Sequence, residues 1–350
     1  MSFNTDTVAH VAGPQRHKAL DPTNDKRPRK RWVSSPWVDF TLRRLGGVLL
    51  SFVLLVVVTF LIVPLIPGDP AQAIAGTDAS PEAVEQIRQR LGLNDPMLVQ
   101  FGNYVAGLLQ LDLGNSFRFG LPVVDIVSAK LPFTAQLALA SIVFVLLIGI
   151  PLGMLVGILT RGGRHGWLDS CFSNGAGFFA AAPPYVIGTL LILGFAILWP
   201  VLPAAGADSL SSLILPTLAL AIGPAAAVAR VVRRETSTVL EQDFMRTARG
   251  KRLSTSKLYL RHALPNLLTS TLTLTGMILA SLLGGAVIVE TVFNYPGIGE
   301  EIIQAIIYRD YPVIQGIILT VGMIATLLTV LVDVILGLID PRTLGSKTHG

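Results

Sequence analysis

The chain has 350 residues, of which 51% are hydrophobic and 14% charged, and its formal net charge is +5. Soluble domains carry about 25% charged residues, so this composition excludes an ordinary soluble protein and indicates contact with lipid. The positive charge does not indicate nucleic-acid binding, because the basic residues gather in short segments between apolar runs, as membrane topology requires. A single cysteine, Cys171, excludes an intramolecular disulfide and a cysteine-based metal site.

Residues 1–40 are polar and contain several prolines. They also carry a basic run, made of Lys26, Arg27, Arg29, Lys30 and Arg31. A secretory signal peptide has only a short basic region before its apolar stretch, so this segment is not predicted to be one. We expect a disordered cytoplasmic tail, which either fixes the topology through its charge or contacts anionic lipid headgroups.

Six apolar segments are long enough to cross the ~30 Å hydrocarbon core of a bilayer, which takes about 20 helical residues. They run from about 45 to 66, 134 to 159, 172 to 198, 213 to 232, 267 to 289 and 313 to 339. Prolines interrupt the second, third and fourth segments and mark places where a helix can bend. The sequence therefore predicts an all-α integral membrane protein with six transmembrane helices.

The distribution of lysine and arginine predicts the orientation. If the N-terminus is inside, 22 of the 27 basic residues lie on the cytoplasmic side. The outer segments then keep only Arg88, Arg90, Arg118, Lys130 and Arg309. The positive-inside rule thus predicts a multi-pass protein of the plasma (inner) membrane with both termini in the cytoplasm.

The outer segment 67–130 is too long for a plain turn and carries signals for helices. Ser80 is suited to cap a helix whose first residue is Pro81, and the apolar spacing up to Leu91 gives that helix one apolar face. A second amphipathic stretch runs over 97–109. We expect a small helical cap on the outer membrane face.

The long cytoplasmic segment 233–266 is basic and patterned. Leu240, Phe244 and Ala248 recur at i, i+4 and i+8, which predicts a short helix with one apolar face. The other face is expected to carry Glu241, Asp243, Arg246 and Arg249. Such a helix buries its apolar face against its own bundle, on lipid or in the groove of a cytoplasmic partner, and the residues alone leave these alternatives open.

Motifs spread over residues 41–343 point to a known family. The cytoplasmic segment contains DFMRTAR at 243–249 and HALPN at 262–266. The other motifs are LRRL at 42–45, IPGDP at 66–70, LGLNDP at 91–96, DLGNS at 112–116, ETVF at 290–293, YPGIG at 295–299, RDYP at 309–312 and DPR at 340–342. Their order and spacing resemble the permeases of binding-protein-dependent ABC importers, specifically the dipeptide/oligopeptide (peptide/nickel) family.

The resemblance implies a type I ABC importer permease fold. The first transmembrane helix and the extracytoplasmic helical segment would occupy 41–130, the core permease domain 131–343, and a short tail 344–350. A coupling helix near 240–252 would dock on a cytoplasmic ATPase subunit. The residues expected to make this contact are Leu240, Glu241, Asp243, Phe244, Arg246, Thr247, Ala248, Arg249, Gly250, Arg252 and Leu253. The family usually has a glycine where this chain has Arg252, which leaves the end of the helix and the register of its contacts open.

The resemblance also implies partners. These are a second, related permease subunit, two cytoplasmic ATPase subunits or domains that hold ATP and Mg, an extracytoplasmic substrate-binding protein, and membrane lipid. The chain has no Walker A motif, since Gly250-Lys251 is followed by Arg252, and we expect no enzyme activity, cofactor or metal in it. The expected substrates are peptides, with nickel, glutathione or another small solute as alternatives; no substrate-binding residue is predicted.

Two other functions remain open at this stage. An ion-driven secondary transporter would need an intramembrane carboxylate with a buried ionisable partner, and Asp333 is the only acidic residue well inside a predicted span. The alternative for Asp333 is pairing near the membrane interface. Glu290, at the outer end of the fifth span, is expected to anchor a loop or form part of an outer gate. A receptor or assembly factor would use the outer segment 67–130 as its binding module.

Overall fold

The computed structural model of the chain describes residues 36–76 and 78–339. Most of the predicted N-terminal tail, the DPR motif and the C-terminal tail lie outside the described residues, whereas residues 36–40 form the start of the first helix. In chain order the helices are α1 (Pro36–Ile62), η1 (Val63–Leu65), α2 (Pro70–Ala75), α3 (Pro81–Arg90), α4 (Met97–Leu109), α5 (Val123–Leu159), η2 (Arg161–Gly163), α6 (Gly166–Ala181), α7 (Pro184–Ile192), η3 (Leu193–Leu198), η4 (Leu210–Leu213), α8 (Ile214–Glu241), α9 (Asp243–Gly250), η5 (Lys257–Ala263), α10 (Leu264–Val292), α11 (Ile298–Ile307) and α12 (Tyr311–Ile339).

The predicted membrane spans correspond to long apolar helices. Among the described residues, four continuous helical stretches are long and apolar enough to cross a bilayer: Phe40–Leu65, Val123–Leu159, Leu210–Glu241 and Tyr311–Ile335. A bent helix pair gives a further candidate span. The fifth predicted span coincides with the 29-residue α10, in which the side chains at 268–275 lie outside the described residues. The all-α multi-pass architecture predicted from the sequence is confirmed.

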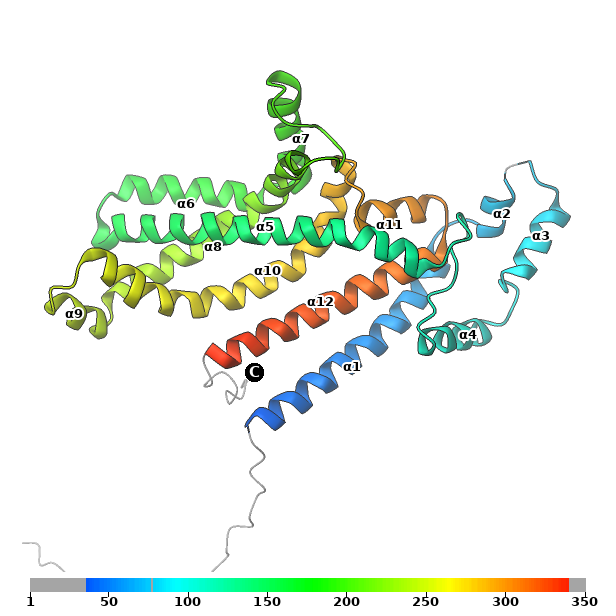
Figure 1. The fold of residues 1–350 in the computed structure, drawn as a ribbon, viewed down its shortest axis with the longest axis horizontal. Helices are drawn as coiled ribbons and strands as arrows, with labels where there is room; N and C mark the ends of the chain where they lie inside the picture. Colours follow the sequence, from blue (N-terminus) through cyan, green and yellow to red (C-terminus); the bar gives the residue numbers. More distant parts are fainter. Residues whose placement is uncertain (1–35, 77, 340–350) are drawn as a thin grey trace, which may run out of the picture.

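The bent pair is the predicted third span, and its break falls at the two prolines. Gly166–Ala181 and Pro184–Leu198 meet at an angle of 95°. Ala182 and Pro183 are extended, with ψ angles of 127° and 137°. A proline restricts the preceding residue to extended conformations and is well suited to begin a helix, which explains both the stop and the restart. In Figure 1 the second arm, α7 with η3, turns away from the long helices, while Ile187 and Gly188 of α7 stay buried against the bundle.

The domain boundary expected at residues 130 and 131 falls inside α5, which runs through it without interruption. This helix begins at Val123 and has 37 residues, which corresponds to a length of about 55 Å. It therefore extends well beyond the ~30 Å hydrocarbon core. Pro132 and Pro151 lie inside it and do not end it. The outer segment and the predicted core are thus joined by one continuous helix.

The two ends of the molecule differ in character. Figure 1 shows α9 at one end, and at the other end the small helices α2–α4, which we call the cap (residues 70–109). The N-terminal end of α1 and the C-terminal end of α12 both point away from the cap. The predicted cap helix is confirmed in detail: α3 begins with Pro81, and the Ser80 hydroxyl accepts a hydrogen bond from the Ala83 amide at 3.3 Å.

Candidate functional site

The candidate site is the segment of residues 240–263 at the end of the bundle opposite the cap, which we call the α9 segment. Its helices do not form the single apolar face expected from the sequence. α8 continues to Glu241, Gln242 is extended with ψ 153°, and a new helix begins at Asp243. Because the chain turns at Gln242, Leu240 and Phe244 lie on different helices. The prediction that Leu240, Phe244 and Ala248 share one face is therefore wrong.

The structure divides the expected apolar residues into a buried and an exposed set. Leu240, Met245 and Ala248 are buried and belong to the main hydrophobic core of this chain. Phe244 keeps 39% of its surface exposed. Leu240 and Ala248 thus hold α9 against its own bundle and are not available to a partner, whereas Phe244 is.

Arg249 fastens α9 to the end of α8. Its Nη2 atom donates a hydrogen bond of 2.6 Å to the carbonyl oxygen of Leu240, one of the carbonyl groups that the end of α8 leaves without a helical partner. Partial burial, followed by the nearby positive charge of Arg161, lowers the pKa of Arg249. This hydrogen bond joins α9 to the end of α8 across the turn at Gln242.

Most of the remaining expected contact residues are exposed on α9 or beside its ends, whereas Leu253 is partly buried against the main core. Together with Phe244, the exposed residues here are Glu241, Asp243, Arg246, Thr247, Gly250 and Arg252. Arg246 and Asp243 form an ion pair at 3.3 Å, but both are largely exposed, so the pair contributes little stability. The face combines one aromatic side chain with charges of both signs, a composition that favours specific registration on a partner.

The structure explains how Arg252 can occupy the position at which the family usually has a glycine. α9 ends at Gly250, and Lys251 has an ordinary φ of −76°. Arg252 then adopts a φ of +50°, in the left-handed region that favours glycine. Helices commonly end with a left-handed residue one position beyond the cap. The helix therefore ends with the conformation that a glycine would supply, and the arginine holds it under strain.

A basic groove lies between α9 and η5. It has a volume of about 600 Å³ and is lined by Phe244, Thr247, Ala248, Lys251, Leu253, Lys257, Arg261 and His262. Within the described part of the chain, no carboxylate forms an ion pair with any of its four basic side chains. The groove combines apolar side chains with basic side chains that form no ion pair with a described carboxylate, and such a groove suits an acidic surface.

A glycine stripe on α5 fixes the position of α8. A Cβ atom added at Gly153 would lie 2.4 Å from the carbonyl oxygen of Ala229, and Gly149 and Gly157 face α8 in the same way. Glycines at this spacing allow two helices to approach closely. The Gly-x3-Gly-x3-Gly spacing is visible in the sequence, but no contact was predicted from it.

Glu290 anchors the segment between α10 and α11, as expected from the sequence. Its carboxylate is fully buried and accepts hydrogen bonds from the Thr134 hydroxyl and the Gly299 amide, both at 2.6 Å. The same hydroxyl accepts a hydrogen bond from the Ile298 amide at 2.9 Å. The ETVF and YPGIG motifs thus meet α5 at one buried carboxylate.

Asp333 forms an ion pair with Arg44, which joins α12 to α1. Arg44 belongs to the LRRL motif at the cytoplasmic end predicted for the first span. Pairing near the interface, one of the two alternatives for Asp333, is therefore what the structure contains. Because the carboxylate is already bound by a permanent cation, it is a poor candidate for an ion-coupling site.

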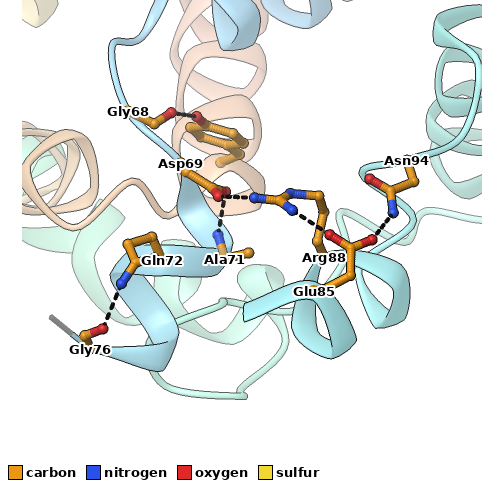
Figure 2. Close-up of polar contacts among 9 residues, drawn as sticks. Gly68, Asp69, Ala71, Gln72, Gly76, Glu85, Arg88 and Asn94 are labelled. Carbon is orange, nitrogen blue, oxygen red and sulfur yellow. Dashed lines mark hydrogen bonds and ion pairs between the residues drawn. The ribbon is translucent and has the colours of Figure 1, made fainter. Parts of the chain in front are cut away.

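At the cap, motifs that are separate in the sequence join in one polar network (Figure 2). Arg88 bridges Asp69 of the IPGDP motif and Glu85. Glu85 in turn accepts a hydrogen bond of 2.7 Å from Asn94 of the LGLNDP motif. The hydrogen bonds from Asn94 and Arg88 lower the pKa of Glu85. This network holds α3 against the chain that leaves α1.

A second contact fastens the DLGNS motif to the RDYP motif. The buried carboxylate of Asp310 accepts hydrogen bonds from the Ser116 hydroxyl and from the amides of Phe117 at 3.0 Å and Arg118 at 3.2 Å. The Arg309 Nε atom donates to the carbonyl oxygen of Pro67 at 3.1 Å. The outer segment is therefore tied directly to the beginning of α12.

Comparison with known proteins identifies the family. Residues 149–345 match the model of the binding-protein-dependent transport system inner membrane component, and residues 37–138 match the N-terminal model of the same kind of membrane component. The chain therefore belongs to this family of importer membrane components. Within it, the chain is a permease subunit of an ABC importer, and it is a multi-pass membrane protein.

The relatives support this assignment over almost the whole chain. A Brucella abortus (strain 2308) protein named as a permease of a peptide transport system is 38% identical over 309 residues, which cover 86% of this chain and 97% of the relative. The glutathione transport system permease protein GsiC of Escherichia coli (strain K12) is 36% identical over 304 residues, covering 87% of this chain and 98% of the relative.

Among solved structures, an inward-facing form of the MetNI methionine ABC transporter matches with a TM-score of 0.51 and 18% identity. The match covers 62% of this chain and 97% of the MetNI chain. At this level of identity the likeness concerns the fold alone. It confirms the predicted type I importer permease fold.

Proposed function

We propose that this permease imports peptides and that the outward face of α9 couples it to cytoplasmic ATPase subunits. The observation that carries the coupling role is the division of the α9 segment. Met245 and Ala248 fix the helix to its own bundle, while Phe244 and the neighbouring charged residues stay exposed. A helix that is firmly attached on one side and free on the other can transmit movement between a partner and the bundle.

The basic groove beside α9 supports the same partner. Its uncompensated cations fit an acidic surface of an ATPase subunit, with Phe244 filling an apolar site on the partner. In this proposal the ATPase subunits hold ATP and Mg, and the permease itself has no catalytic activity. In this proposal the α9 end of the molecule and both termini lie in the cytoplasm, which the distribution of basic residues in the sequence supports.

A second permease subunit is proposed to cover the projecting arm of α7 and η3. Large apolar side chains are exposed along this arm: Leu190, Leu193, Phe195, Ile197, Leu198 and Trp199. The arm leaves the bundle at a 95° bend, and these six side chains lack cover from the described helices. A related chain in the membrane would provide that cover and the other half of the translocation path. A substrate-binding protein would deliver substrate at the cap end.

The peptide substrate is proposed from the relatives, whose names assign them to peptide and glutathione transport. Glutathione, itself a peptide derivative, is the first alternative, and nickel or another small solute the next. The test is uptake of labelled dipeptides, pentapeptides and glutathione by the complete transporter in proteoliposomes. Competition among peptides with different side chains would support the proposal. Uptake of glutathione alone, unaffected by excess peptides, would contradict it and identify glutathione as the substrate.

The coupling role is tested with Phe244→Asp in the same proteoliposomes. We expect ATP-driven uptake to fall at least tenfold, because the charge cannot enter an apolar site on the partner. Arg164→Asp, an exposed change in the connection between α5 and α6, is the control and should leave uptake within a factor of two. Normal uptake by Phe244→Asp would rule out this face as the coupling contact.

A further inference from the structure

The cap borders an open pocket that the α9 segment does not contribute to. It has a volume of about 750 Å³ and is adjacent to a smaller pocket of about 180 Å³. The two share the lining residues Leu91, Asn103, Tyr104, Phe117, Pro312 and Gln315. Pocket volumes of about 300–1,000 Å³ are typical of sites for small ligands. The larger pocket lies between the cap and the beginning of α12.

The lining combines apolar walls with two opposite charges. Ile74, Ile87 and Leu113 contribute apolar surface, and Arg90 and Asp112 contribute the charges. In the part of the chain that the structure describes, no ion pair joins Arg90 to Asp112 or to any other carboxylate. The two charges therefore face the same pocket without neutralising each other.

Neutral polar groups of the lining are also unpaired. Among the described residues, the amide side chains of Asn103, Asn115 and Gln315 form no hydrogen bond within the chain. The Tyr104 hydroxyl is enclosed and has no partner, and burial raises its pKa to about 12. Asp112 uses one carboxylate oxygen to accept the Gly114 amide at 2.8 Å, which leaves the other free. The Tyr104 hydroxyl is the buried member of this set, and a buried polar group without a partner is costly unless water or a ligand satisfies it. Arg90, Asn103, Asp112 and Asn115 are exposed to solvent and therefore accessible to a ligand.

The frame of the pocket is held in place before any ligand arrives. Asp310 fixes the turn that carries Asn115, and Arg88 fixes α3, which carries Arg90. A preformed pocket loses less conformational entropy on binding than one that must be assembled.

We propose that this pocket binds a short zwitterionic peptide at the outer face of the transporter. Arg90 binds the terminal carboxylate, the free oxygen of Asp112 binds the terminal ammonium group, and the three amide side chains bind the peptide backbone between them. Charge-assisted hydrogen bonds at both ends select for free termini and tolerate different side chains. The choice of peptide as ligand rests on the proposed function; the pocket itself is a receiving site separate from the α9 contact.

The experiment measures direct binding to the complete permease–ATPase complex in nanodiscs, without the binding protein. Equilibrium dialysis with labelled tri-alanine is compared with N-acetylated, C-amidated tri-alanine. We expect tri-alanine to bind and the capped form to bind at least tenfold more weakly. Arg90→Gln and Asp112→Asn should each weaken tri-alanine binding at least tenfold. Arg118→Gln is the matched control, because Arg118 lies over the Tyr308 ring and does not line the pocket.

Equal binding of the free and capped peptides, unchanged binding by both variants, or no binding of tri-alanine would each overturn the proposal. Uptake with the binding protein present separates this outcome from failure of the proposed function. If tri-alanine is imported but not bound directly, the pocket assignment is wrong and the peptide importer stands. If tri-alanine is bound but not imported, the pocket is supported and the proposed substrate fails. The Tm of each variant is measured as well, and a Tm equal to that of the wild type confirms that the cap remains folded.

Discussion

At the scale of single residues, Arg252 shows how a local conformation is retained when the usual residue is replaced. A left-handed conformation costs a residue other than glycine about 1–2 kcal/mol. The chain accepts this cost at Arg252 because α9 is already fixed by Met245, Ala248 and the Arg249 hydrogen bond to α8. The strain therefore lies beside the exposed face of α9 and does not unwind the helix.

Replacing Arg252 with glycine should stabilise the α9 segment. Relief of the left-handed strain exceeds the conformational entropy that glycine loses on folding, about 0.5–1 kcal/mol, so a net gain of up to about 1 kcal/mol is expected. Thermal unfolding of the purified transporter measures it as a higher Tm. Lys251→Gly is the control, because Lys251 has φ −76° and gains nothing from glycine. Equal shifts in Tm for both variants would contradict this explanation.

At the scale of helices, the contact between α5 and α8 links the α9 segment to the cap end. α5 begins next to the outer segment, and its glycine stripe brings it close to the backbone of α8 along the half that leads to α9. Since α8 and α9 are joined by the Arg249 hydrogen bond, the three helices form a continuous mechanical connection.

Gly153→Val should disrupt this connection. The added side chain would meet the Ala229 carbonyl and Val232, so α8 must shift, at a cost of about 1–3 kcal/mol typical of overpacking. We expect a lower Tm together with reduced uptake. Gly175→Val in α6 is the matched control, because a Cβ there meets no atom within 4 Å. If Gly153→Val lowers neither the Tm nor the uptake more than the control does, the close packing of α5 on α8 is unimportant.

The sequence predicted those elements whose signals are local. Ser80 and Pro81 begin α3, Pro183 and Pro184 break the third span, and the apolar runs define the spans. The turn at Gln242 was missed because the residue is neither proline nor glycine, and tertiary packing determines it. Pairing was one of the alternatives for Asp333, but Arg44 could not be named as the partner, because the contact joins helices far apart in the chain.

At the scale of the whole molecule, the two ends are built for different tasks. The cap end is closed by polar networks around Asp69, Asp310 and Glu290. The α9 end leaves a charged face and a basic groove without partners among the described residues. This asymmetry fits a permease that receives solute at one end and movement at the other.

The most direct test of the coupling claim is photo-cross-linking in the assembled transporter. A photoreactive amino acid is placed at Phe244 or Thr247, on the exposed face of α9, and at Met245, on its buried face. The account predicts cross-links from the two exposed positions to an ATPase subunit, and from Met245 only to the permease's own bundle. Cross-links from Phe244 and Thr247 that reach only lipid or the same chain would contradict it.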